Sequence, residues 1–251
     1  MNHANKQDTK VAIITGAARR IGAAIAKYLH ASGFNVVIHY NNSKADALAL
    51  MQSLNLKRQD SAIILQANLC VKKEVVKLIN DALAWKNRLD LLVNNASIFK
   101  STLSTEPNSE DVDTLLFNTN VLAPFRLCQQ AYQYLALKYG VIINITDIHA
   151  AKPLKDYALY CQSKAALNMQ TLSLAKEFAP FVRVNAIAPG AIAWPEGENQ
   201  LSIELQNKII ESTPLKRHGD PIYIAKAVLA LAENPFITGQ ILNVDGGRSL
   251  T

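Results

Sequence analysis

Short runs that are apolar at nearly every position recur along the chain and predict the strands of a sheet. A strand with water on one face alternates apolar and polar residues, whereas a strand buried on both faces is apolar throughout. The runs are VAIIT (11–15), FNVVIHY (34–40), AIILQA (62–67), LDLLVNN (89–95), GVIINIT (140–146), VRVNAIA (182–188) and ITGQILNVDG (237–246). They predict a parallel sheet of about seven strands, covered on both faces.

Longer segments with helical periodicity separate these runs. They lie near 20–32, 43–56, 71–87, 108–137, 156–179 and 220–233. Strands and helices in alternation predict a doubly wound α/β fold with helices on both faces of the sheet. The chain has no internal repeat or linker, so we expect a single domain over residues 1–251. Within it, residues 1–9 are expected to be a flexible lead-in, and about 190–215 a long mobile loop.

Composition and charge exclude several classes of protein. Hydrophobic residues make up 49% and charged residues 18%, as in an ordinary globular protein. The apolar runs are too short to span a bilayer and the polar N-terminus lacks the apolar core of a signal peptide, so we expect a cytoplasmic protein without membrane contact. The net charge of +6 is spread along the chain, which favours a mildly basic solvated surface over a nucleic-acid partner. Cys70, Cys128 and Cys161 show no metal-site spacing, which predicts reduced thiols and no bound metal.

The segment TGAARRIG (15–22) directly follows the first predicted strand and opens a helix. Gly16 allows a sharp turn and Gly22 allows the helix to pack closely on the sheet, while the helix N-terminus offers free N–H groups to a pyrophosphate. An ordinary strand–helix turn is the alternative, but it does not explain the adjacent Arg19 and Arg20. The segment therefore predicts a dinucleotide-binding turn.

The end of the second predicted strand reads HYNNSK (39–44). Sites specific for NAD place an acid here to hold the ribose hydroxyls. No Asp or Glu occurs from 36 to 44, and Asn41, Asn42 and Ser43 are neutral donors. Since an acid would repel a 2′-phosphate, its absence favours NADPH over NADH, with a generic polar loop as the alternative.

Tyr160 and Lys164 are four residues apart, so both side chains lie on one face of the predicted helix. Asp147 follows the apolar run at 140–146. Taken alone, an Asp at this position most often caps the following loop, but its order with Tyr160 and Lys164 favours a site residue. Tyr157 is a rival tyrosine, yet four residues further on stands Cys161, which cannot take the part of a lysine.

The motifs TGAARRIG, NNAS (94–97), Asn120, Tyr160-xxx-Lys164 and PG (189–190) stand in an order that resembles the short-chain dehydrogenase/reductase family. The resemblance covers nearly the whole chain. It implies a Rossmann-like fold, hydride transfer from a nicotinamide and, usually, a homotetramer.

Within that family the chain looks like the pteridine reductases and the bacterial dihydromonapterin reductases. Most family members have glycine at the position of Arg20, NNAG in place of NNAS, and serine at the position of Asp147. The narrower resemblance implies that Arg20 lies near both the pterin and the cofactor phosphates, that Ser97 contacts cofactor or substrate, and that Phe99 stacks on the pterin. Two departures are Asn68, which replaces an acid that touches adenine, and Asn42, which replaces a basic residue of the protozoan enzymes.

The resemblance thus predicts three sets of residues. The catalytic set is Asp147, Tyr160, Lys164 and Asn120. The cofactor-binding set is Gly16, Arg19, Arg20, Ile21, Gly22, His39, Tyr40, Asn41, Asn42, Ser43, Asn68, Leu69, Asn95, Ala96, Ser97, Tyr160, Lys164, Pro189, Gly190 and Ile192. The substrate-binding set is Arg20, Ser97, Phe99, Asp147, Tyr160 and Trp194, with plain packing as the alternative for Phe99 and Trp194.

Two roles in the catalytic set are implied further. Lys164 would bind the nicotinamide ribose and lower the pKa of Tyr160, and Asn120 would hold a water that links Lys164 to solvent. The loop at 190–215 would read the side chain of the substrate.

The acid at 147 bears on the reaction. In carbonyl reduction, negative charge builds on the substrate oxygen, which a carboxylate opposes and a hydroxyl donor stabilises. Reduction of a C=N bond instead requires a proton on nitrogen, which a carboxyl group beside a tyrosine helps to deliver. The sequence therefore predicts an NADPH-dependent pteridine reductase that converts a 7,8-dihydropterin, such as dihydrobiopterin, dihydromonapterin or dihydrofolate, to the tetrahydro form. The alternatives are a 3-oxoacyl-carrier-protein reductase or other carbonyl reductase, and an NADP-binding regulatory protein without turnover.

Overall fold

The computed structural model describes residues 9–102, 110–195 and 200–251, and these contain one sheet of seven parallel strands. Its order is β3-β2-β1-β4-β5-β6-β7. The strands are β1 (Val11–Ile14), β2 (Asn35–Tyr40), β3 (Ala62–Gln66), β4 (Leu91–Asn94), β5 (Val141–Ile145), β6 (Arg183–Pro189) and β7 (Ile241–Val244). All residues of β1, β2, β4 and β5 are buried, so the continuous apolar runs confirm the predicted buried parallel sheet.

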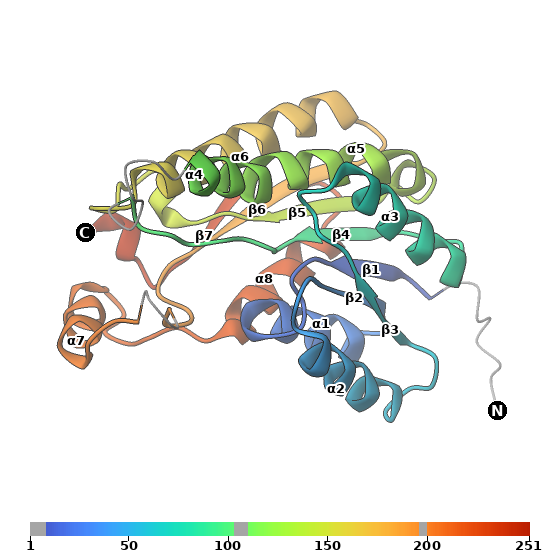
Figure 1. Cartoon of the computed structure of the whole chain (residues 1–251), viewed down its shortest axis with the longest axis horizontal. Coiled ribbons are helices and arrows are strands. Elements are labelled where there is room, and N and C mark those ends of the chain that lie inside the picture. The colour runs from blue at the N-terminus through green and yellow to red at the C-terminus, as the bar shows by residue number, and fades with distance from the viewer. Residues whose placement is uncertain (1–8, 103–109, 196–199) are drawn as a thin grey trace.

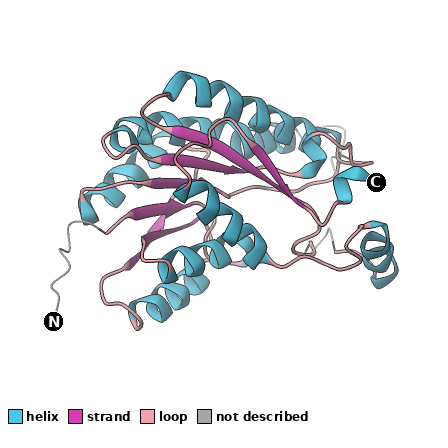
Figure 2. Ribbon diagram, turned by 180° about the vertical axis from the view of Figure 1, so that it is seen from behind, coloured by secondary structure: helices cyan, strands magenta, loops and turns pink. Residues whose placement is uncertain are grey.

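Helices cover both faces of this sheet (Figures 1 and 2). On one face lie α1 (Arg20–Ala31), α2 (Lys44–Asn55) and α8 (Pro221–Glu233); on the other lie α3 (Lys72–Lys86), α4 (Glu110–Phe117), α5 (Ala123–Ala136) and α6 (Ala158–Phe178). Each layer has its own apolar core, with Ile25 and Val228 in the first and Leu78 and Leu127 in the second. The predicted doubly wound α/β fold is confirmed.

Three element boundaries differ from the prediction. The expected helix over 108–137 is interrupted by a π-helical turn, η2 (Asn118–Leu122), between α4 and α5, and residues 108–109 lie outside the described part. The expected strand over 237–246 is limited to β7, because Gly239 turns the chain with a φ of +69° before the strand begins. The expected loop over 190–215 contains α7 (Ile203–Ser212), with Ser202 as its N-cap. Residues 196–199 of that loop, and 1–8 of the predicted lead-in, lie outside the described residues.

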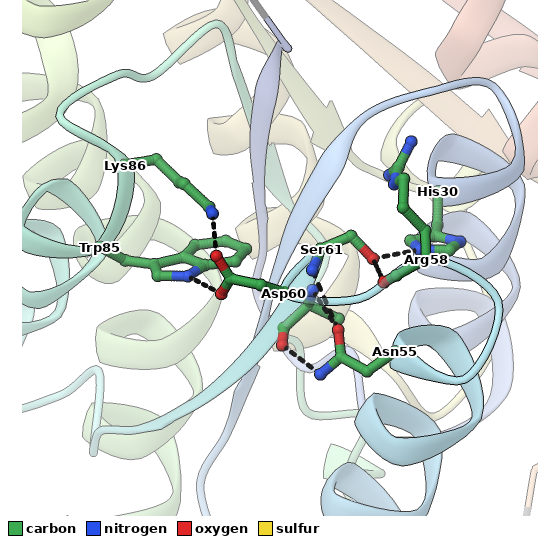
Figure 3. Close-up of polar contacts among 8 residues, drawn as sticks. His30, Asn55, Arg58, Asp60, Ser61, Trp85 and Lys86 are labelled. Atoms are coloured by element: carbon green, nitrogen blue, oxygen red, sulfur yellow. Dashed lines mark hydrogen bonds and ion pairs between the residues drawn. The ribbon is translucent and has the colours of Figure 1, made fainter. Parts of the chain in front are cut away.

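A group of polar contacts stabilises the turn between α2 and β3 (Figure 3). Asp60 has a left-handed backbone, with a φ of +53°, and its carboxylate accepts hydrogen bonds from Trp85 Nε1 at 2.9 Å and from Lys86 Nζ at 2.5 Å. The Oδ1 atom of Asn55 accepts hydrogen bonds from the amides of Ser61 and Ala62, and its Nδ2 donates to the carbonyl of Ala62. These contacts fix β3 at the edge of the sheet, against α3.

Candidate active site

The turn after β1 fits so closely against the segment after β4 that two of its positions admit only glycine. Gly16 has a φ of +60°, and a Cβ atom on Gly22 would lie 2.3 Å from the carbonyl oxygen of Gly16. Asn95 closes the turn from β4, since its Nδ2 donates to the carbonyls of Thr15 at 2.8 Å and Gly16 at 3.1 Å. The start of α1 is thereby pressed onto the sheet, as a dinucleotide-binding turn requires.

His39, which was predicted to contact a cofactor, supports this turn from β2. Its Nδ1 accepts from the amide of Gly16 at 3.0 Å, so its Nε2 carries the proton and donates to the carbonyl of Ala67 at 3.0 Å. Burial lowers the pKa of His39 to about 4, against a weaker opposing effect of the Ala67 carbonyl. Both ring nitrogens are occupied, and the residue therefore acts on the site through Gly16.

Asp147 and Tyr160 are in direct contact at the carboxyl end of β5. The Tyr160 hydroxyl donates to Oδ2 of Asp147 at 2.7 Å, while Oδ1 accepts from the amide of His149 at 2.9 Å. The carboxylate is thus both the cap of the short helix η3 (Ile148–Ala150) and the partner of the tyrosine. The two roles that the sequence left open are compatible, because each uses a different oxygen.

Lys164 lies one turn along α6 from Tyr160 and is only 3% exposed. Its Nζ donates to the carbonyl of Ile145 at 3.1 Å. Burial lowers the pKa of Lys164 to about 8, while the charge of Asp147 acts in the opposite direction. Its ammonium group is therefore poised near neutral pH, where it can change protonation state.

The pKa of Tyr160 is raised, which is the opposite of the predicted direction. Burial of the phenol is the largest cause, followed by the charge of Asp147 and the hydrogen bond to it. Burial of the phenol and the neighbouring carboxylate both favour retention of the phenolic proton. Tyr160 is accordingly a proton-bearing group at neutral pH.

Asn120, in η2, joins this pair to the segment after β4. Its Oδ1 accepts from Ser97 Oγ at 3.0 Å and from the amide of Ile98 at 2.9 Å, and its Nδ2 donates to the carbonyl of Ile98 and to Ser163 Oγ. The side chain thus has four protein partners, and any water would have to be held by other atoms. The π-helical turn is the local distortion that aims the amide at these groups, as such turns often do at functional sites.

Three aromatic rings form a wall beside the tyrosine. Phe99 stacks on Tyr157 with ring centroids 4.3 Å apart and an interplanar angle of 10°, and meets Tyr160 edge-on at 4.8 Å. The rival tyrosine of the sequence therefore backs Phe99. Phe99 is partly exposed, so it can still offer surface to a flat ligand.

Arg20 links the dinucleotide turn to the loop after β6. Its guanidinium donates to the carbonyls of Ala193 at 3.1 Å and Trp194 at 2.8 Å. Trp194 in turn lies against His218 with ring centroids 4.3 Å apart. Arg20 and Trp194 are thus brought together, although Arg20 has a left-handed φ of +53° that most residue types avoid.

Comparison with known proteins matches this arrangement to one family. A family model described as enoyl-(acyl carrier protein) reductase matches residues 16–249. The chain is 39% identical to a 3-oxoacyl-[acyl-carrier-protein] reductase of Synechocystis sp., over 95% of this chain and 96% of that protein. It is 36% identical to the enzyme of that name from Staphylococcus epidermidis (95% and 98%) and 34% identical to the short chain dehydrogenase mdpC of Emericella nidulans (96% and 95%).

The chain belongs to the short-chain dehydrogenase/reductase family. Members of this family are oxidoreductases that use a nicotinamide dinucleotide. The structure offers a fitting site for one: α1 has neither a side-chain cap nor an acid in its first turn, so no group of this kind on α1 competes with an anion for its first N–H groups.

Other predicted cofactor residues surround this end of the sheet. Asn41 and Asn42 are exposed where β2 ends, and Arg19 lies nearby in a 3.7 Å ion pair with Asp46. Asn68 has its Oδ1 engaged with the amide of Cys70 at 3.0 Å. The remaining members lie at the carboxyl ends of the strands. Tyr40 and Pro189 are the last residues of β2 and β6, and the others lie in or beyond the segments that follow β1, β2, β3, β4 and β6: Ile21, Ser43, Leu69, Ala96, Gly190 and Ile192. Tyr40, Leu69, Pro189 and Ile192 are buried.

Thr15 is a supporting residue of this short-chain dehydrogenase/reductase site that the prediction missed. Its Oγ1 accepts from the amides of Asn95 and Ala96 at 2.9 and 3.0 Å and donates to the carbonyl of Val93. The signal was available, since a buried threonine at the end of a strand requires polar partners. Ser163, one helical turn from Tyr160, was missed as well.

Metal-site clusters and membrane-spanning helices were not expected, and the described part of the chain bears on both. Its His, Cys, Asp and Glu side chains form no group of three that could hold a metal ion. No described helix is both long and apolar enough to cross a membrane.

Proposed function

We propose that this oxidoreductase is a pteridine reductase, and the observation that carries the proposal is the hydrogen bond from Tyr160 to Asp147. A ketone reductase needs the tyrosine to donate to an oxygen that gains negative charge. Here the phenol donates to a carboxylate 2.7 Å away, and that carboxylate would repel the developing charge. A C=N bond has no such oxygen, so the same pair suits it better.

The reaction balances at this site. A reduced nicotinamide bound at this site would supply the hydride for the carbon of the C=N bond, and the nitrogen that gains the electron pair would require one proton. Tyr160 holds a proton at neutral pH, and Asp147 is placed to pass a further proton to it from solvent. Lys164 keeps a positive charge behind the pair and is buried within hydrogen-bonding reach of the β5 backbone.

The aromatic wall supports a flat heterocycle as substrate. Phe99 is held parallel to Tyr157 and perpendicular to Tyr160, so its exposed surface is fixed in orientation beside the proton donor. A pterin stacked there gains both apolar burial and the offset-stacking interaction. Arg20 and Ser97 have exposed side chains, and they are the polar groups proposed to bind the pterin.

We further propose NADPH as the cofactor. No acidic residue stands between 36 and 44, and Arg19 lies beside the end of β2 with an exposed side chain. The ion pair of Arg19 with Asp46 is exposed and 3.7 Å long, so it is weak enough for a 2′-phosphate to replace it. A homotetramer is also proposed, since Met169 and Leu172 on α6 and Leu242 on the edge strand β7 are exposed apolar residues that subunit contacts would cover.

A second candidate is reduction of a 3-oxoacyl thioester. The Synechocystis and Staphylococcus relatives are 3-oxoacyl-[acyl-carrier-protein] reductases, which supports this candidate more directly than pterin reduction. Identity of 36–39% carries the family and the hydride chemistry, whereas the substrate depends on a few side chains of the site. The Asp147 carboxylate is the feature that this candidate leaves unexplained.

The test compares substrates and carboxylate variants in one assay. NADPH oxidation is followed with dihydrobiopterin, dihydromonapterin, dihydrofolate and a β-ketoacyl thioester, for wild type, Asp147→Ser and Asp147→Asn. We expect turnover of a dihydropterin that falls about 100-fold or more in both variants, the usual size of an acid–base contribution. Asp156→Asn, which removes a carboxylate near Tyr157 without touching the Tyr160 hydroxyl, is the matched control.

The outcomes separate the candidates. Turnover of the thioester alone, retained or raised in Asp147→Ser, would establish the second candidate. NADPH binding without turnover of any of the four compounds would instead indicate the non-catalytic alternative.

A further inference from the structure

Helix α7, in the loop that would read the substrate, is attached without a core of its own. None of its described residues is buried, and Ile203 and Leu205 expose 77% and 43% of their surface. Figures 1 and 2 show α7 standing apart from the two helical layers, at the end of the sheet where the C-terminus also lies. The position of such a helix depends on the contacts at its ends.

The C-terminal end of α7 is held by Arg248, in the last turn of the chain, η5 (Arg248–Leu250). Its Nη1 donates to the carbonyl of Ile209 at 3.1 Å and to Ser212 Oγ at 3.2 Å. The carbonyl of Ile209 also accepts from Ser212 Oγ at 2.9 Å and from Thr213 Oγ1 at 2.8 Å. The guanidinium adds a donor from outside α7, and a cation at the end of a helix also interacts favourably with the helix dipole. Arg248 is therefore a side-chain cap for α7.

The same residue is tied to the segment that carries the catalytic acid. Its carbonyl accepts from Lys152 Nζ at 3.1 Å, and the amide of Lys152 donates to the carbonyl of Ile148 at 3.0 Å. Ile148 opens η3, which Asp147 caps. A chain of short contacts thus runs from α7 through Arg248 and Lys152 to Asp147.

The charge of Arg248 also acts on this region. Burial lowers the pKa of its guanidinium, and the carboxylates of Asp147 and Asp245 act against that effect. A guanidinium stays protonated in proteins, so a fixed positive charge faces Asp147 from the side of α7. Asp147 also interacts electrostatically with Tyr160 and Lys164 on α6.

Backbone packing leaves little freedom for Arg248 to move. The amide of Leu215 donates to the carbonyl of Gly246 at 3.1 Å, and a Cβ atom on Gly247 would lie 2.9 Å from Cγ of Pro214. The turn that carries Arg248 is therefore pressed against the segment that leaves α7.

We propose that Arg248 is a positioning residue that fixes α7 relative to the Asp147–Tyr160 pair and so sets the affinity for the part of the substrate that α7 contacts. The inference rests on the proposed function only in that the substrate enters beneath this loop. Arg248 touches none of the reacting atoms, so its loss weakens substrate binding more than it slows the chemical step.

The test combines hydrogen–deuterium exchange with kinetics on the full chain. In Arg248→Met, amides of α7 exchange faster while those of β4, β5 and α6 do not change. The KM for the substrate rises about tenfold, as expected for loss of two hydrogen bonds, while kcat and the Kd for NADPH stay within about twofold. Arg248→Lys, which keeps the charge and a donor, restores much of the KM, and Ser212→Ala gives a smaller rise.

The matched control is Arg217→Met. Arg217 lies in the same part of the chain but donates to the Tyr223 hydroxyl, and its loss leaves α7 exchange and KM unchanged. Unchanged α7 exchange in Arg248→Met overturns the proposal, as does faster exchange throughout the protein with weaker NADPH binding. If wild type turns over no compound in the assay, the proposed function fails, whereas the exchange experiment still tests whether Arg248 fixes α7.

Discussion

The amide of Gly16 donates a hydrogen bond of 3.0 Å to Nδ1 of His39, which requires His39 to be neutral. Its pKa is lowered from the ordinary 6.5 to about 4 by burial. As the pH falls below 6.5, the unfolded chain takes up a proton at this residue that the folded protein excludes, so stability is lost between the two values. The difference corresponds to about 3 kcal/mol of unfolding free energy.

We therefore predict that His39→Gln is less sensitive to acid than wild type. Glutamine can accept from Gly16 and donate to Ala67 but does not titrate, so wild type should lose its advantage as the pH falls from about 6.5 to about 4.5. Urea unfolding at fixed protein concentration measures the gap between the two proteins. Between about pH 7.5 and 8.5 the difference in unfolding free energy between the two proteins should stay constant. A difference that also stays constant from about pH 6.5 to 4.5 would contradict the lowered pKa of His39.

Gly22→Ala is predicted to weaken NADPH binding. The added methyl group would lie 2.3 Å from the Gly16 carbonyl oxygen and 2.6 Å from Nδ2 of Asn95, and the first of these atoms is backbone. The turn has to open, which at about 1–3 kcal/mol corresponds to a rise in Kd of about 5- to 150-fold. Fluorescence titration with NADPH measures it. Lys27→Ala, on the exposed side of α1, should bind as wild type does, and equal affinity of both variants would show that the turn tolerates the methyl group.

Asp60→Ala is predicted to destabilise the fold without affecting the site. It removes the acceptor for Trp85 and Lys86 and leaves a residue with a Cβ in a left-handed conformation. The expected loss is about 2 kcal/mol, since each effect contributes about 1 kcal/mol. Asp60→Asn keeps an acceptor and tolerates this backbone, so its loss should be under about 1 kcal/mol. Thermal unfolding measures both, and equal losses would mean that neither the backbone nor the Trp85 contact is responsible.

Elements could be predicted from the sequence where the residue types themselves reflect burial. Strands such as β1 and β5 are apolar throughout because both faces are buried, and this pattern is visible in the sequence alone. Helix α7 was missed because the Pro and Gly residues between 189 and 197 indicated a loop, and the helix that follows them buries none of its residues. The break at Asn120 was missed because it depends on contacts with Ile98 and Ser163, which are distant in the sequence.

Within the site, proximity was more predictable than charge. The order of Asp147 and Tyr160 along β5 and α6 was enough to expect them together, and they are 2.7 Å apart. The direction of the Tyr160 pKa was not predictable, because it depends on how deeply the phenol is buried and on which neighbour it meets. Arg248 carried no motif at all, and only its contacts with α7 identify it.

Replacement of Lys164 by an apolar residue is predicted not to destabilise the fold. Burial lowers the pKa of Lys164 from 10.5 to about 8. Keeping this side chain charged therefore costs the folded protein free energy relative to the unfolded chain, where water solvates the charge. At neutral pH this penalty is about 3 kcal/mol, and it is partly offset by the hydrogen bond to Ile145. Lys164→Met should therefore lose at least 100-fold in kcat/KM yet unfold at the same or a higher urea concentration at about pH 7.

The pH dependence distinguishes this explanation from simple tolerance of methionine. Between about 8 and 10.5 the unfolded chain keeps the lysine proton that the folded protein has released, so wild type gains stability relative to Lys164→Met as the pH rises. Urea unfolding of both proteins at about pH 7 and about pH 9.5 measures the change. If wild type gains nothing on the variant, the lysine titrates at its ordinary pKa and is not poised for proton transfer near neutrality. A gain of about 2 kcal/mol between these two pH values would mean that the site retains a destabilising buried charge because the reaction requires it.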